Sequence, residues 1–117
     1  MALNVTQQVD EGFGVLHLAG SLTLGPLLTA VREAARQVLA TGKLHGLILL
    51  VKDVKSVDSA GLGELTIVYT LATRQKLGIR LVGCTPSLLK MLDMTRLEEL
   101  LRPFESMEGA KRDLLDK

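Results

Sequence analysis

The chain has few aromatic residues, a single cysteine and no long apolar run, and each shortage argues against a class of protein. Aromatic residues make up 3% of the sequence and tryptophan is absent, which argues against stacking platforms for single-stranded nucleic acid or sugars. The single cysteine, Cys84, rules out an internal disulfide and a cysteine-rich metal site. No apolar run approaches the roughly 18 residues of a transmembrane helix.

Concentrated charge is also lacking. The formal net charge is +1, and the basic residues are interleaved with acidic ones. No basic patch is therefore predicted for binding nucleic acid or an anionic membrane. The N-terminus has no basic segment followed by a long apolar core, so no signal peptide is predicted. We expect a cytoplasmic protein in a reducing compartment, without a bound cofactor.

The sequence does contain enough apolar residues, 47% of 117, to build one compact core, and we expect a single domain over residues 1–117. Strand and helix signals alternate along it. The predicted strands are Leu3–Val9, Phe13–Ala19, Leu47–Val51, Ile79–Val82 and a short edge strand at Phe104, and the predicted helices are an apolar stripe from Leu24 to Leu39, Ser59–Leu77, Pro86–Asp93 and Met107–Leu115. This order predicts an α/β fold with a mixed, mainly parallel sheet of roughly four to five strands, an antiparallel N-terminal edge strand and about four helices.

Binding sites on such sheets lie at the carboxyl ends of the parallel strands, where residues 20–26, 52–59 and 83–87 form the predicted loops. The middle loop leads into a helix that Ser59 is placed to cap, its hydroxyl accepting a hydrogen bond from the first turn. Gly61 and Gly63 follow, and each costs about 1 kcal/mol relative to alanine inside a helix. Two glycines there indicate a close approach, either by a neighbouring loop of the same domain or by a partner.

Enzymatic interpretations of this segment fail on its surroundings. The nucleophile elbow of α/β-hydrolases is Gly-x-Ser-x-Gly, but Val57 stands at the first position. That fold also needs a histidine after the nucleophile, whereas His17 and His45 both precede Ser59. A phosphate-binding glycine loop would need a third glycine where Thr66 stands, and no metal-ligating cluster has usable spacing. We therefore expect no enzymatic activity.

The residues Asp58-Ser59-Ala60-Gly61-Leu62-Gly63 after an apolar strand resemble the signature of the STAS domain family, in particular the bacterial anti-sigma-factor antagonists. The resemblance extends over essentially the whole chain. It implies that Ser59 is phosphorylated by an anti-sigma factor that is a serine kinase, and that a PP2C-type phosphatase resets it. The unphosphorylated form would bind the anti-sigma factor and so release a sigma factor. The partner-binding residues implied in this way are Asp58, Ser59, Ala60, Gly61, Leu62, Gly63 and Thr23.

One departure from the family pattern concerns Thr23, which stands where family members usually carry an aspartate in a Gly-x-Leu-Asp pattern. A hydroxyl cannot supply a charged contact, so Thr23 has a second interpretation as the cap of the first helix, with Pro26 in its first turn. Among other residues, Met91 and Met94 are expected in the core, and Cys84 is expected to be a buried, inert thiol.

Alternative functions stay open on the sequence. One is a STAS module of another assembly, such as a stressosome or a transporter complex, that works without phosphorylation. Another is a sensor that binds a nucleotide or small molecule through the same strand-end loops. We expect a monomer, because no large apolar stripe is left over once the helices face the sheet.

Overall fold

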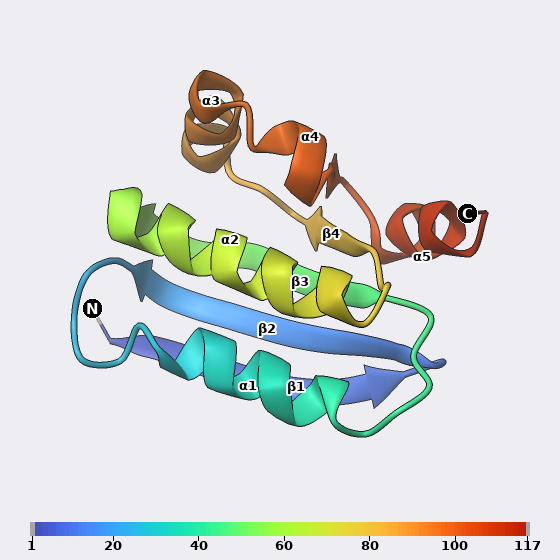
Figure 1. Ribbon diagram of the computed structural model, residues 1–117. Helices are drawn as coiled ribbons and strands as arrows, with labels where there is room; N and C mark the ends of the chain where they lie inside the picture. The colour runs from blue at the N-terminus through green and yellow to red at the C-terminus, as the bar shows by residue number, and fades with distance from the viewer. Residues whose placement is uncertain (1, 117) are drawn as a thin grey trace.

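The computed structural model describes residues 2–116, which form one five-stranded sheet with the strand order β1-β2-β3-β4-β5 (Figure 1). Strands β1 and β2 are antiparallel, and β2 to β5 are parallel to one another. The elements are β1 (Leu3–Asp10), β2 (Phe13–Leu22), α1 (Ala30–Leu39), β3 (Leu47–Val57), α2 (Ser59–Arg74), β4 (Ile79–Val82), α3 (Pro86–Thr95), α4 (Glu98–Leu101), β5 (Pro103–Phe104) and α5 (Met107–Leu115). The predicted fold class is confirmed.

The two faces of the sheet are covered unequally. Helices α1 and α2 lie across one face (Figure 1), where the larger core gathers apolar residues of β2, β3, β4 and all helices except α5. On the other face, Ala110 and Leu114 of α5 pack against Phe13, Val15 and Ile48 in a smaller cluster. The loops that follow β2, β3 and β4 lie at the carboxyl ends of these parallel strands, where binding sites on such sheets are found.

The first helix begins later than its apolar stripe predicts. The stripe holds from Leu28 and Val31 onward, which are buried, but the helix starts at Ala30. Leu24 is 80% and Leu27 is 50% exposed, so the prediction that they belong to the buried stripe is wrong. The physical reason is the Gly25-Pro26 pair between them, because proline disfavours helical backbone in the residue before it and glycine adds a conformational cost.

Several other boundaries also moved. Strand β3 runs on to Val57 instead of ending at Val51, because its second half still pairs with β2 as far as Leu22. Helix α2 ends at Arg74 rather than Leu77, and α3 extends to Thr95. The short helix α4 was not predicted. Glu11 and Gly12, both at positive φ, form the hairpin turn between β1 and β2.

Candidate functional site

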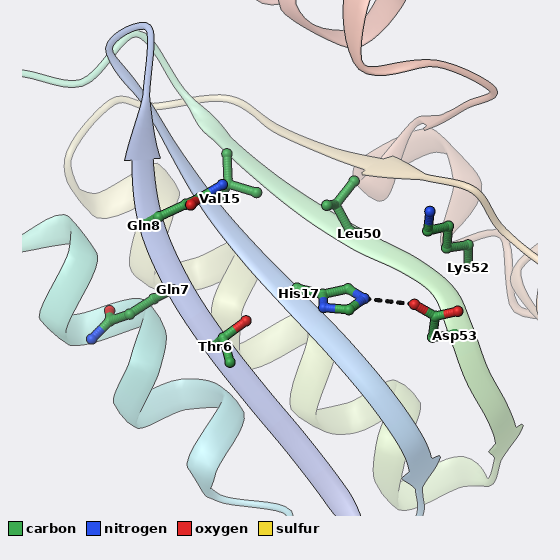
Figure 2. Close-up of a pocket in the computed structure, with 8 residues that line it drawn as sticks. All are labelled: Thr6, Gln7, Gln8, Val15, His17, Leu50, Lys52 and Asp53. Carbon is green, nitrogen blue, oxygen red and sulfur yellow. Dashed lines mark hydrogen bonds and ion pairs between the residues drawn. The ribbon is translucent and has the colours of Figure 1, made fainter.

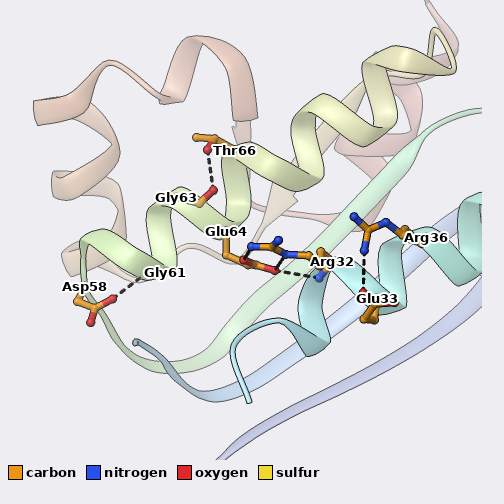
Figure 3. Close-up of polar contacts among 8 residues, drawn as sticks. All are labelled: Arg32, Glu33, Arg36, Asp58, Gly61, Gly63, Glu64 and Thr66. Atoms are coloured by element: carbon orange, nitrogen blue, oxygen red, sulfur yellow. Dashed lines mark hydrogen bonds and ion pairs between the residues drawn. The ribbon is translucent and has the colours of Figure 1, made fainter. Parts of the chain in front are cut away.

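Asp58, at the junction of β3 and α2, is the residue that caps the second helix. Its backbone is extended, and its Oδ1 accepts a hydrogen bond from Gly61 N at 2.9 Å (Figure 3). The prediction that Ser59 is the cap is therefore wrong. Aspartate and serine cap about equally well, and here the carboxylate stands one position earlier, so Ser59 becomes the first residue of α2 and its side chain is exposed.

The same carboxylate also holds the loop that follows β2. Its Oδ2 accepts a hydrogen bond from Leu24 N at 3.0 Å. The backbone N–H of Leu24, together with that of Gly61, lowers the pKa of Asp58 below its usual value, because hydrogen bonds to the charged form favour it. Asp58 therefore joins two loops that the sequence separates, and it does so as an anion.

The two glycines of the first turn have different surroundings. A Cβ on Gly61 would lie 1.9 Å from the carbonyl oxygen of Leu22, whereas a Cβ on Gly63 would meet nothing within 4 Å. The close approach at Gly61 is thus made by the end of β2 in the same domain. Of the two alternatives for the glycines, a neighbouring segment or a partner, the first applies at Gly61. Gly63 faces open space, so the domain itself gives no reason for a glycine there.

The remaining residues implied by the resemblance divide between core and surface. Leu62 is buried in the main core, while Ala60 and Thr23 are partly buried. Thr23 does not cap the first helix, because Thr29 occupies that position and makes no side-chain cap bond. Ser59 is the exposed side chain of the segment, and Gly63 leaves the adjacent turn open.

A buried ion pair beside the site was missed by the sequence reasoning. Glu64, 2% exposed, receives Arg32 Nη2 at 2.6 Å on Oε1 and Arg32 Nε at 2.9 Å on Oε2 (Figure 3). The backbone N–H of Arg32 donates to the same Oε2 at 3.2 Å. The pair links α1 to α2, and the hydrogen bond to Glu64 raises the pKa of Arg32. A charged residue four positions before the buried Val68 was the available signal, since such spacing places both on one helix face.

The histidines and the cysteine lie in other contacts. His17 Nε2 and Asp53 Oδ2 are 2.7 Å apart on the face of the sheet opposite α1 and α2, beside a hollow of about 360 Å³ (Figure 2). His45 packs its ring 5.4 Å from that of Phe13. Cys84, expected to be buried, is only partly buried, and this burial raises the pKa of its thiol to about 11, so the thiol stays protonated at neutral pH.

Residues 2–116 lack two features that would indicate other functions. This part of the chain holds no group of three histidine, cysteine or acidic side chains able to bind a metal ion. It likewise contains no helix of the length and apolarity needed to cross a membrane. Of the two methionines expected in the core, Met91 packs against it, but Met94 is 73% exposed, so that prediction is wrong for Met94.

Fold and site together define a small α/β domain with a mixed sheet and an exposed serine at the start of the helix that follows its central strand. The family model of the STAS domain matches residues 4–110, and the chain belongs to the STAS domain family. Among curated protein sequences, none matches this chain significantly.

Solved structures support the same fold. A putative anti-sigma factor antagonist from Thermotoga maritima superposes with a TM-score of 0.82 at 16% identity, covering 94% of this chain and 93% of the other. An anti-sigma factor antagonist from Mycobacterium paratuberculosis gives 0.77 at 19% identity, with 97% and 94% covered. The Bacillus cell fate determinant SpoIIAA in its phosphorylated form gives 0.68 at 17% identity, with 95% and 98% covered.

Proposed function

We propose that this protein is an anti-sigma-factor antagonist, a non-enzymatic, cytoplasmic and monomeric binding module that is switched by phosphorylation of Ser59. Unphosphorylated, it binds an anti-sigma factor that is a serine kinase and so frees a sigma factor for transcription. A PP2C-type phosphatase restores this form. The observation that carries the proposal is the exposed Ser59 side chain on the first residue of α2, beside the open turn at Gly63.

The position of Ser59 suits a group that gains and loses charge. A phosphoryl group adds a charge of about −1.5 to −2, and the N-terminus of a helix offers free N–H donors and the positive end of the helix dipole. The domain can therefore carry the phosphate without losing its fold. A structural relative solved in the phosphorylated state, the Bacillus SpoIIAA protein, supports this expectation for the fold.

The partner surface would respond to the same charge in the opposite way. A surface that fits a neutral hydroxyl has to accept a dianion, and a charge left unpaired in an interface costs several kcal/mol. Every 1.4 kcal/mol is a factor of about ten in affinity, so we expect phosphorylation to weaken binding by at least about a hundredfold.

The test measures affinity for the anti-sigma kinase encoded in the same genome. Ser59→Ala should bind like the wild type and take up no phosphate, and Ser59→Asp should stay folded by circular dichroism yet bind poorly. Ser87 gives a matched control, because it is exposed in the first turn of α3 at the same end of the sheet. Ser87→Asp should leave binding unchanged. Equal affinity of Ser59→Asp and wild type, or phosphate mapped to Ser56 or Thr66, would contradict the proposal.

A further inference from the structure

The loop of residues 23–29 carries two leucines that the core does not bury, and it is hydrogen-bonded to Asp58, the residue before Ser59. Leu24 and Leu27 are 80% and 50% exposed, whereas Leu28 is buried. The start of the loop is fixed by the backbone, because Leu22 O accepts a hydrogen bond from Asp58 N at 3.3 Å. Beyond that point, the hydrogen bond from Leu24 N to the Asp58 carboxylate ties the loop to the start of α2.

Both oxygens of Asp58 are used, and the residue next to it is the proposed phosphoacceptor. Oδ1 caps α2 through Gly61 N, and Oδ2 holds Leu24 N. A phosphoryl group on Ser59 would place a second anion beside the carboxylate, and like charges repel. It would also compete for the N–H groups of the first helical turn.

The two bonds of Asp58 differ in how easily they can be lost. The bond to Gly61 spans three residues and closes the first turn of α2, whereas the bond to Leu24 holds a loop residue 34 positions away in sequence. Gly25 and Pro26 follow Leu24, and both are exposed. A displaced carboxylate can keep the first bond by staying close to its own helix, so the bond to Leu24 is the one that gives way.

We infer that Asp58 couples the state of Ser59 to the loop 23–29, which is held as the apolar part of the partner surface when Ser59 is unphosphorylated and released when it is phosphorylated. The inference rests on the proposed function for its partner, the anti-sigma factor. That partner would present an apolar patch to Leu24 and Leu27 next to the position of the Ser59 hydroxyl. Phosphorylation then removes shape complementarity as well as adding charge.

The coupling can be measured on the isolated protein by NMR amide exchange. With phosphoserine incorporated at position 59, the Leu24 amide should exchange at least about tenfold faster, as expected when a hydrogen bond to a charged acceptor is lost. Asp58→Ser should do the same without phosphate, because a serine can still cap α2 but has one oxygen and cannot serve both loops. The Gly61 amide should stay protected in Asp58→Ser, and phosphoserine at Ser87 should leave Leu24 unchanged.

The outcomes separate this inference from the proposed function. Unchanged exchange at Leu24 with phosphoserine at position 59 overturns the coupling, whatever the protein binds. The partner role of the leucines is tested by Leu24→Ser and Leu27→Ser, which should each weaken binding of the anti-sigma kinase at least about tenfold. Leu115→Ser, at a leucine 57% exposed on α5 at the other end of the sheet (Figure 1), is the matched control. Unchanged affinity in the two loop variants overturns that role, and failure of the wild type to bind overturns the proposed function.

Discussion

The starts of helices α1 and α2 are built in opposite ways. Asp58 caps α2 with a side-chain hydrogen bond, and the turn behind it closes on the end of β2 through Gly61. Thr29 at the start of α1 makes no side-chain cap bond, and the turns before it leave Leu24 and Leu27 exposed. The difference shows that an apolar stripe alone does not fix where a helix begins: a cap does so at α2, and the Gly25-Pro26 pair delays the start of α1. The start without a cap bond is also the one whose preceding turns expose two leucines.

The largest effect is expected from Gly61→Ala, which places a methyl group 1.9 Å from the Leu22 carbonyl oxygen. Backbone atoms of β2 cannot move aside without disturbing the strand, so we expect a loss of about 3 kcal/mol or more in the free energy of unfolding, at the upper end for overpacked sites. Denaturant melts measure it. A loss below about 1 kcal/mol would mean that β2 and α2 are not in contact at this point.

A smaller effect is expected from removing the cap itself. Asp58→Ala should destabilise the fold because it leaves the Gly61 and Leu24 N–H groups without their acceptor. Thr29→Ala is the matched change at the other helix and should alter the free energy of unfolding by less than about 0.5 kcal/mol, as for a site without a cap bond. Equal effects at the two positions would remove the distinction between the two helix starts.

The cap also predicts a dependence on pH. The pKa of Asp58 is lowered in the folded protein, chiefly by the N–H of Leu24. Its contribution to stability is therefore complete above the unfolded-state pKa of about 4 and is lost as the pH falls through the lower folded-state pKa. The difference in unfolding free energy between wild type and Asp58→Ala should shrink between about pH 5 and about pH 2. A constant difference across that range would show that the carboxylate makes no such bonds.

A modest gain in stability is expected from Gly63→Ala. The added Cβ meets nothing within 4 Å, and alanine favours the helix, so the free energy of unfolding should rise by up to about 1 kcal/mol. The affinity of Gly63→Ala for the anti-sigma kinase also tests where the partner binds. If a partner lies close to α2 at this turn, the more stable variant should bind the anti-sigma kinase more weakly than wild type, whereas unchanged affinity would place the partner elsewhere.

The fold was predictable where an apolar pattern and a boundary signal agree. The predicted strand Leu47–Val51 forms the first half of β3, where four of its five residues are buried. The apolar pattern gave a wrong prediction at Leu24 and Leu27. The helical spacing of apolar residues continues there, but Gly25 and Pro26 keep this segment out of α1. At the start of α2, Asp58 and Ser59 are both residue types that cap helices. The sequence spacing alone could not show which of the two is the cap.

The Arg32–Glu64 ion pair could not be predicted from the sequence for a different reason. Its two residues are 32 positions apart. The local sequence patterns of α1 and α2 do not show which charged side chains of the two helices contact each other. A pairing of this kind is set by how α1 and α2 come together. Sequence reasoning could place Arg32 on a polar helix side, but it could not see that a buried carboxylate lies opposite.

That pair bears on how many arrangements the two helices can adopt. Apolar contacts between helices are tolerant, since a slide or rotation replaces one leucine contact by another of similar energy. The guanidinium and carboxylate meet through two parallel hydrogen bonds with a third from the Arg32 backbone, and such geometry accepts a single register. A shifted α2 would leave the Glu64 charge buried and unpaired, which is strongly unfavourable. The pair thus acts mainly against alternative packings, and it keeps the helix that carries Ser59 in one orientation toward whatever approaches it.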